Sequence, residues 1–155
     1  MTCYLRKAKM DDCDLLFEWT NYPMVRQNSF STKAITYDEH VNWFRNIMER
    51  KDCVQYIYME GDKPIGQARI QICDDMAEIS YSIIPEKQSL GHGHEILLDI
   101  CDEVWREFPN VTKVVGKVKP DNIASQKAFE KAGYKEVCRV YEVEKNNIKN
   151  IWRKL

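Results

Sequence analysis

The residues with the most specific chemical potential form the segment Gln88-Ser89-Leu90-Gly91-His92-Gly93, between a predicted strand and a long amphipathic helix. The first backbone N–H groups of a helix have no acceptor within it and carry partial positive charge. A diphosphate can accept hydrogen bonds from these groups if no Cβ blocks its approach, and Gly91 and Gly93 provide that opening. The segment therefore predicts a site for a phosphate-bearing ligand.

Two other phosphate-binding motifs do not fit this segment. The dinucleotide-binding fingerprint needs a third small residue at the position of Ile96. A Walker loop needs Gly-Lys-Ser or Gly-Lys-Thr, which the segment lacks. On their own, the two glycines also fit an ordinary turn at the start of a helix, so a second signal is needed to assign a ligand.

That signal lies about thirty residues further on, in Asn122-Ile123-Ala124-Ser125-Gln126-Lys127-Ala128-Phe129-Glu130-Lys131-Ala132-Gly133-Tyr134. The two segments, at this separation, resemble the two motifs of the GNAT superfamily of acyl-CoA-dependent N-acetyltransferases. The order of the predicted elements agrees with that family over nearly the whole chain. The resemblance implies acetyl-CoA as the cofactor, no metal, and direct transfer of an acetyl group to a primary amine.

The resemblance also implies which residues contact the cofactor. Backbone groups of the loop would bind the pyrophosphate, and the end of the preceding strand would bond the pantetheine amides, together with side chains of the last helix. Asn122 has a competing structural role, because asparagine is also a good helix N-cap. The predicted contacts are Ile83, Gln88, Ser89, Leu90, Gly91, His92, Gly93, His94, Asn122, Ser125, Phe129 and Lys131.

The reaction needs a base, because the attacking amine must be neutral. Glu78 is the predicted base, since Glu78-Ile79-Ser80-Tyr81-Ser82-Ile83 resembles the strand that carries a glutamate base in histone-type members. His40 is the alternative, because an imidazole titrates near neutral pH. The simpler interpretations are a solvated carboxylate at the first position and a surface histidine at the second.

The proton donor for the leaving thiolate is not evident from the sequence. Many family members place a tyrosine seven residues after the motif asparagine, but here that position is Phe129, which has no proton to give. Ser125, Tyr81 and Tyr141 are the candidate donors. Solvent and the departing ammonium are the alternatives.

The acceptor side resembles two branches of the superfamily. Trp19-x-Asn21-x-Pro23-x-Val25-Arg26 is similar to ribosomal-protein N-terminal acetyltransferases, and with Glu39-His40-x-x-Trp43-Phe44 and Ile65-Gly66-Gln67-x-Arg69 the chain resembles amino-sugar N-acetyltransferases of pseudaminic acid biosynthesis. That resemblance implies a UDP-linked amino sugar, with tryptophans stacking on rings and arginines pairing with a diphosphate. The alternatives are core tryptophans and surface arginines, a protein N-terminus or small amine as substrate, or a non-catalytic acyl-CoA-binding module. The predicted substrate contacts are Trp19, Asn21, Arg26, His40, Arg69 and Tyr81.

Hydrophobic periodicity predicts one mixed α/β domain over residues 1–155, in the order β-α-α-β-β-β-α-β-α-β-β. Its sheet is expected to have seven mostly antiparallel strands, flanked by four helices. Asn21-Tyr22-Pro23 is expected to end the first helix, and Thr36-x-x-Glu39 to open the second through a capping box. The chain is expected to close with a hairpin of strands 134–144 and 148–154.

The chain is expected to lie in the cytoplasm, and its composition gives no reason to expect nucleic acid or membrane as a partner. Its 23 basic and 24 acidic residues give a net charge of −1, and no apolar run approaches the ~20 residues of a membrane span. The six cysteines include no Cys-x-x-Cys pair, so they predict neither a zinc site nor a disulfide framework. Both a monomer and a homodimer are compatible with the sequence.

Overall fold

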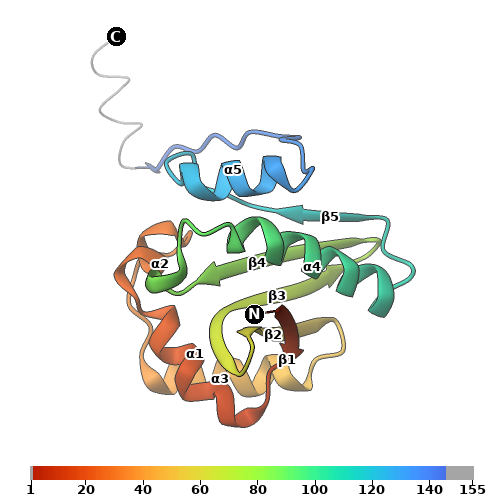
Figure 1. The fold of residues 1–155 in the computed structure, drawn as a ribbon. Coiled ribbons are helices and arrows are strands. Elements are labelled where there is room, and N and C mark those ends of the chain that lie inside the picture. Colours follow the sequence, from red (N-terminus) through yellow and green to blue (C-terminus); the bar gives the residue numbers. More distant parts are fainter. Residues whose placement is uncertain (1, 146–155) are drawn as a thin grey trace.

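A mixed sheet of five strands organises the described part of the chain, residues 2–145 of the computed structural model. The strands lie side by side in chain order, β1 to β5 (Figure 1). The first four are antiparallel neighbours, whereas β5 runs parallel to β4 after the crossover through α4. The strands are β1 Cys3–Lys7, β2 Cys53–Glu60, β3 Lys63–Cys73, β4 Met76–Ile83 and β5 Lys113–Gly116.

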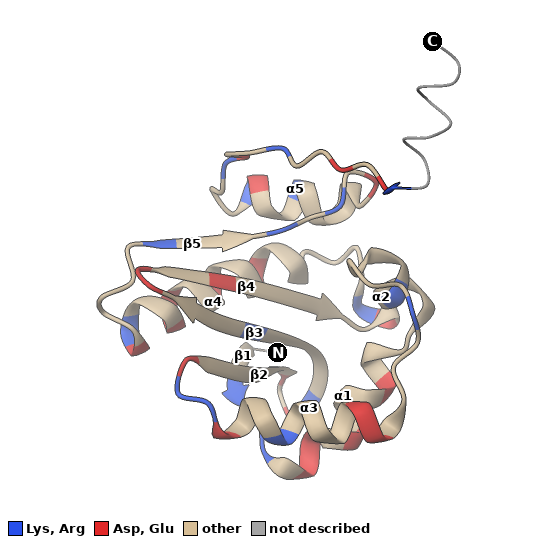
Figure 2. Ribbon diagram, turned by 180° about the vertical axis from the view of Figure 1, so that it is seen from behind, with Lys and Arg blue, Asp and Glu red and all other residues tan. Residues whose placement is uncertain are grey.

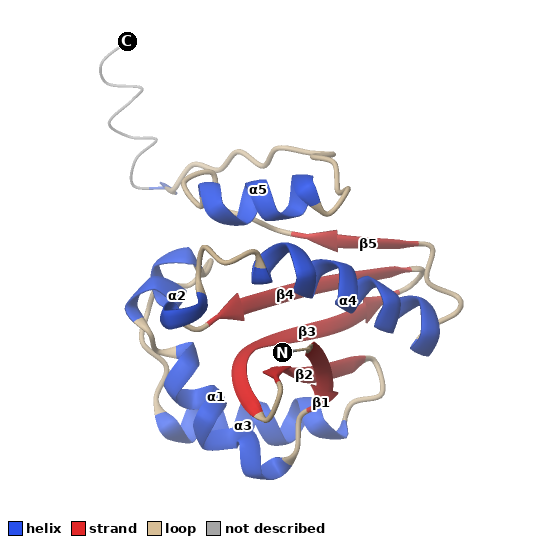
Figure 3. Cartoon of the chain, viewed as in Figure 1, coloured by secondary structure: helices blue, strands red, loops and turns tan. Residues whose placement is uncertain are grey.

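Helices cover both faces of the sheet (Figure 3). Helix α4 crosses one face, against β4, β3 and β1, while α3 packs on β2 from the other face and α1 packs on α3. Short 3-10 turns at Met10–Asp12 and Pro85–Lys87 precede α1 and the loop before α4. The helices are α1 Cys13–Thr20, α2 Pro23–Asn28, α3 Tyr37–Glu49, α4 His92–Glu107 and α5 Ile123–Lys131.

The apolar periodicity of α4 is confirmed as the contact between this helix and the sheet. Ile96, Ile100 and Val104 recur every four residues and are at most 1% exposed. They pack on the sheet face that carries Tyr56 and Tyr58, whose hydroxyls reach the carboxylates of Glu103 and Asp99 on α4. This packing fixes the start of α4 relative to the end of β4.

The capping box at the start of α3 is confirmed. Glu39 N–H donates to Thr36 Oγ1 at 3.2 Å, and Thr36 N–H donates to the Glu39 carboxylate at 3.0 Å. The segment 21–23 is more than a helix stop, because Pro23 is the first residue of the unpredicted helix α2. Proline suits that position, where its missing N–H would have had no partner.

The prediction of seven strands and four helices is wrong, since the described residues form five of each. Residues 134–144 form no strand, and the apolar side chains of Val137, Val140, Tyr141 and Val143 are exposed. A strand needs a neighbour for its backbone groups, and the described residues offer this segment none. The expected partner at 148–154 lies outside the described residues.

The surface carries both charge signs on its helices and loops, as Figure 2 shows, in keeping with the net charge of −1. None of the helices among residues 2–145 is long and apolar enough to cross a membrane.

Candidate active site

The loop between β4 and α4 presents a run of backbone donors without acceptors. Ser89 and Gly91 adopt left-handed conformations, with φ of 62° and 86°. Among the described residues, nothing accepts a hydrogen bond from the six N–H groups of Ser89 through His94. Alternation of left-handed and ordinary residues turns successive N–H groups to one side, which is the geometry of an anion-binding nest. This geometry can accommodate a phosphate group at the positive end of α4, and residues 88–94 are called the phosphate loop below.

The two glycines of the loop have different roles. A Cβ on Gly91 would meet no atom of the described residues within 4 Å, so this side of the loop can admit a ligand. A Cβ on Gly93 would lie 3.3 Å from the Tyr81 hydroxyl and 3.4 Å from Ala128 Cβ. Gly93 thus lets α4 approach β4 and α5, while its role in clearing space for a diphosphate stays a prediction.

The side chains of the loop divide between solvent and protein. Ser89 and Leu90 are exposed, whereas the His92 side chain turns inward and is only 10% exposed. His92 can therefore serve the loop through its backbone N–H alone. Gln88 folds back on β4, where its Nε2 donates to Ile83 O at 3.1 Å. The backbone carbonyl of Ile83, one of the predicted cofactor contacts, therefore already has a partner.

Strands β4 and β5 separate before β4 ends. Their pairing stops at Ile79 and Gly116, while β4 continues to Ile83. Successive residues of a strand present their backbone groups to opposite neighbours. Because Ile84 N–H bonds Ile65 O on the β3 side, the backbone groups of Tyr81 face the side that β5 has left. This edge is open to an extended ligand.

Helix α5 reaches this region through its first turn. The Ser125 hydroxyl lies 3.1 Å from the Tyr81 hydroxyl. Asn122 is the N-cap of α5, and its Oδ1 accepts a hydrogen bond from Ser125 N–H at 3.2 Å. Asn122 therefore acts as a helix N-cap through Oδ1, and its side-chain amide nitrogen takes no part in that hydrogen bond.

The side chain of Phe129 on α5 packs against strands β4 and β5. Its ring lies so close to Gly116 that a Cβ there would be 2.3 Å from the ring. It also lies edge-on to Tyr134, with ring centroids 4.9 Å apart, and 6.0 Å from the Tyr81 ring. Phe129 therefore closes the gap between β5 and α5 by packing, without a polar group.

Two of the predicted site residues, Lys131 and Tyr141, have exposed side chains. Lys131 is exposed in the last turn of α5. Tyr141 is 86% exposed on the segment after α5 that forms no strand. The prediction of Tyr141 as a proton donor is corrected, since its position depended on a strand that the described residues do not form.

Glu78 lies on the face of β4 opposite α4. Its register partner on β3 is Gln71, and its carboxylate forms an ion pair with Lys117 at 3.1 Å. Ser80 and Ser82 continue the same face toward the phosphate loop, because side chains two apart on a strand share a face. Glu78 thus begins a polar row that ends beside the loop.

A polar chain that the sequence alone did not predict crosses three strands on that face. The Gln55 amide donates to Gln67 Oε1 at 2.7 Å, and the Gln67 amide donates to Ser82 Oγ at 3.1 Å. Gln55 is only 4% exposed, a rare position for an unpaired amide. The signal available in the sequence was the polar alternation of β3, which matches that of β4.

Arg69 lies on the same face and is the predicted substrate residue that remains available there. Its register partners are Ser80 on β4 and Gln55 on β2. Its guanidinium lies 5.2 Å from the ring centre of Trp43 on α3, a cation–π contact. Tyr81 is on the opposite face, toward α4, so its assignment to the substrate side is corrected.

His40 is neither a surface residue nor an available base. It is 1% exposed, its Nε2 lies 2.8 Å from Cys13 O, and its ring stacks on Phe44. Burial lowers the pKa of His40 below its ordinary value. A neutral imidazole that donates to a backbone carbonyl links α3 to α1, and the prediction of a catalytic or substrate role for His40 is corrected.

Trp19 and Asn21 also have structural roles. Trp19 is 5% exposed in the core, so its ring cannot stack on a ligand. The Asn21 amide donates to Ile35 O and its carbonyl accepts from Ile35 N, both at 3.0 Å. These bonds fasten the segment before α3 to the end of α1. Both substrate predictions are corrected.

The Arg26 guanidinium is occupied by the backbone around it. It donates to the carbonyls of Thr20, Ser31 and Lys33 and to Ser29 Oγ, at 2.8 to 3.2 Å. These contacts use all three guanidinium nitrogens, so the predicted pairing with a diphosphate is corrected. Arg26 holds the connection between α2 and α3 in place.

The fold and the loop define the class of protein. The sequence profile of the Acetyltransferase (GNAT) domain family matches residues 3–135. The chain therefore belongs to the GNAT acetyltransferase family, whose cofactor is acetyl-coenzyme A. The free N–H groups at the start of α4 and the open edge of β4 fit the pyrophosphate and amides of that cofactor.

Individual relatives are more distant. Acetyltransferase PseH of Campylobacter jejuni is 23% identical over 117 residues, which cover 75% of this chain and 72% of PseH. The aminoglycoside acetyltransferase AAC(6′)-Ib, solved with coenzyme A and kanamycin, has a TM-score of 0.74 and 20% identity over 85% of this chain and 83% of its own. RimL, a ribosomal L7/L12 acetyltransferase solved with coenzyme A, has a TM-score of 0.74 and 18% identity, covering 86% and 80%. The structural likenesses show a shared fold.

Proposed function

We propose that this acetyltransferase transfers the acetyl group of acetyl-CoA to a primary amine on an amino sugar. The single observation that carries the cofactor part is the run of six N–H groups from Ser89 to His94, for which residues 2–145 provide no acceptor. A pyrophosphate offers oxygens for several of them at once, at the positive end of a 16-residue helix.

The open edge of β4 continues this site. The backbone N–H and C=O of Tyr81 face the side vacated by β5, where an amide of an extended ligand can pair as a strand would. Ser125 and the Asn122 amide nitrogen approach the same region from α5. The cofactor would therefore extend from its pyrophosphate at the loop along the open edge of β4.

The acceptor amine would bind on the opposite face of β3 and β4. Polar side chains line that face from Gln67 and Ser82 to Glu78, and Trp43 borders it with Arg69. An amino sugar suits such a surface, because its hydroxyls need hydrogen-bond partners and its ring can lie on an aromatic side chain. Similarity to PseH and the kanamycin complex of AAC(6′)-Ib also support a sugar amine.

The UDP part of the predicted substrate has weaker support than the sugar. Two arginines were expected to pair with a diphosphate, but all three guanidinium nitrogens of Arg26 donate to its own loop. Arg69 alone stays available, beside Trp43. We therefore propose an amino sugar as the substrate class and assign no site to a nucleotide.

Glu78 is the proposed base. Its carboxylate lies on the acceptor face, where it forms a 3.1 Å ion pair with Lys117, and a carboxylate can accept the proton of the amine. Acetyl-CoA supplies the acetyl thioester. The neutral amine loses one proton when the amide forms, and the sulfur gains one when the thioester bond breaks. The net reaction of the neutral amine therefore needs no separate proton source.

Tyr81 is proposed as a positioning residue. Its hydroxyl lies against Gly93 at the start of α4 and bonds Ser125, so it holds the loop and α5 together. Burial raises the pKa of Tyr81, which keeps the hydroxyl protonated. No side chain is assigned as the acid for the thiolate, because Phe129 has none to offer.

The test is acetyl-CoA turnover with a panel of amines, measured as the release of free thiol. The panel should contain amino sugars, peptides with free N-termini, and polyamines. Fastest turnover with amino sugars is expected; a preference for a peptide N-terminus would favour the RimL-like alternative. Tight coenzyme A binding by calorimetry without thiol release from any amine would instead identify a non-catalytic acyl-CoA-binding module.

A further inference from the structure

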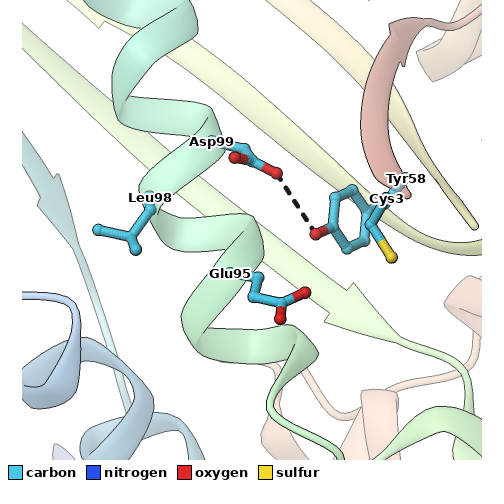
Figure 4. Close-up of a pocket in the computed structure, with 5 residues that line it drawn as sticks. All are labelled: Cys3, Tyr58, Glu95, Leu98 and Asp99. Carbon is cyan, nitrogen blue, oxygen red and sulfur yellow. Dashed lines mark hydrogen bonds between the residues drawn. The ribbon is translucent and has the colours of Figure 1, made fainter. Parts of the chain in front are cut away.

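Three different metal-ligand side chains converge beside the first turn of α4. Cys3 belongs to β1, and His92 and Glu95 belong to the first turn of α4. One ligand atom of each, Sγ, a ring nitrogen and a carboxylate oxygen, lies within 4.8 Å of the other two. Figure 4 shows Cys3 and Glu95 beside one hollow, which Tyr58, Leu98 and Asp99 also line.

The distances come close to those of a tetrahedral site. Ligands held at 2.0–2.3 Å in a tetrahedron are about 3.3–3.6 Å from one another. His92 Nδ1 lies 3.9 Å from Cys3 Sγ and 3.6 Å from Glu95 Oε2. The remaining pair, Cys3 and Glu95, can close through the Glu95 side chain, which is 53% exposed and free to change rotamer.

The His92 imidazole faces both of the other side chains through one nitrogen. Its side chain is 10% exposed, and Nδ1 is hydrogen-bonded to Cys3 Sγ at 3.9 Å and lies 3.6 Å from Glu95 Oε2. A thiol is a weak partner for an imidazole, and a metal ion between the same three atoms would take the place of this hydrogen bond.

We propose that Cys3 Sγ, His92 Nδ1 and a Glu95 oxygen bind one divalent metal ion of the zinc type. Thiolate, imidazole and carboxylate together suit Zn²⁺, whereas Mg²⁺ and Ca²⁺ take oxygen ligands. The fourth coordination position of the ion would face the hollow and be filled by water. Because neither the loop N–H groups nor the acceptor face is part of this site, the ion has a structural role outside the acetyl transfer.

Glu60 supports the site from the other side of the ring. Its carboxylate lies 3.7 Å from His92 Nε2, and Lys87 holds the same carboxylate through a 2.7 Å ion pair. Metal-binding histidines commonly donate their second N–H to a carboxylate, which fixes the tautomer and the ring orientation. Glu60 is placed to do this at Nε2 while Nδ1 faces the metal.

The ion would fasten the phosphate loop to the edge of the sheet. His92 contributes a backbone N–H to the loop and its side chain to the proposed site, and Cys3 belongs to the edge strand β1. Binding to the folded state alone stabilises it, so Zn²⁺ is expected to raise the melting temperature. This inference does not depend on the acceptor amine or on acetyl-CoA.

Co²⁺ and Zn²⁺ titrations of the full chain, without acetyl-CoA, test the site. One Co²⁺ per chain is expected, with a thiolate-to-cobalt charge-transfer band that Zn²⁺ abolishes. Cys3→Ser should remove the band, and both it and Glu95→Gln should weaken Zn²⁺ binding by more than about 100-fold. Glu60→Gln should weaken it by about 10–100-fold, as outer-shell changes do.

The matched control is Cys73→Ser, which removes an exposed thiol remote from the cluster. It should keep both the band and the affinity. The proposal is overturned if the wild-type chain shows no thiolate band, or if Cys3→Ser keeps it. Glu95→Gln guards against misfolding as the cause of a loss, because it alters an exposed side chain; unchanged Zn²⁺ affinity in this variant would remove Glu95 from the site.

Discussion

The hydroxyl of Tyr81 on β4 lies 3.1 Å from the hydroxyl of Ser125 in the first turn of α5. The pair joins the strand that precedes the phosphate loop to the helix whose N-cap is Asn122. Gly93, the second glycine of the loop, lies against the same Tyr81 hydroxyl. The two sequence motifs, far apart in the chain, thus meet through one tyrosine.

Replacement of Tyr81 by phenylalanine should raise the KM for acetyl-CoA and leave kcat within about tenfold. Loss of a general acid would lower the rate by about 10²–10⁴-fold, so the size of the effect separates a positioning role from an acid. A double-mutant cycle with Ser125→Ala should give a coupling of about 0.5–1.5 kcal/mol in unfolding free energy. A drop in kcat beyond 100-fold would make Tyr81 the proton donor after all.

Gly91→Ala and Gly133→Ala form a matched pair that separates ligand binding from backbone strain. Both glycines have left-handed φ, 86° and 93°, and a Cβ at either would meet nothing within 4 Å. Each substitution should therefore destabilise the protein by about 1–2 kcal/mol. Only Gly91→Ala should weaken coenzyme A binding, measured by calorimetry. Equal affinity in the two variants would argue against a phosphate at this loop.

The free N–H groups of the phosphate loop were predictable because they depend on local structure alone. A strand, a glycine-containing turn and a helix start suffice to place free N–H groups, and all three are contiguous from Ile83 to His94. The distinct roles of Gly91 and Gly93 were not predictable, because the neighbour that limits Gly93 is Tyr81, which folding brings close.

The acceptor side was mispredicted for the opposite reason. Whether Trp19, His40 or Arg26 faces solvent depends on how α1, α2 and α3 pack, which periodicity alone does not set. The Arg26 guanidinium donates to carbonyls of its own loop, and the His40 ring donates to the carbonyl of Cys13. The polar row on β3 and β4 was visible as alternation, but its continuity required the strand register.

Glu78→Gln should lower kcat/KM at neutral pH by about 10²-fold or more, because the amide cannot accept the amine proton. The loss should shrink as the pH approaches the pKa of the amine, where the substrate is already neutral. Glu49→Gln, an exposed carboxylate on α3, is the control and should leave the profile unchanged. A uniform loss across the pH range would show that Glu78 binds the substrate instead of accepting its proton.

The buried imidazole of His40 should make stability depend on pH. Burial lowers its pKa in the folded state below the ordinary value of 6.5, so the unfolded chain binds a proton at a higher pH than the folded one. The free energy of unfolding should therefore be greatest above pH 6.5 and fall as the pH decreases toward the folded-state pKa. Urea unfolding between pH 5 and 7.5 measures this slope.

His40→Gln should flatten that slope, whatever its effect on stability at pH 7.5, because an amide does not titrate. His94→Gln, which removes an imidazole on α4 and leaves His40 in place, should keep the slope. If both variants retain it, the pH dependence arises from other groups and the neutral, buried state of His40 is not what limits stability in mild acid. If His40→Gln alone flattens it, the α1–α3 contact through Cys13 O is the acid-sensitive point of the fold.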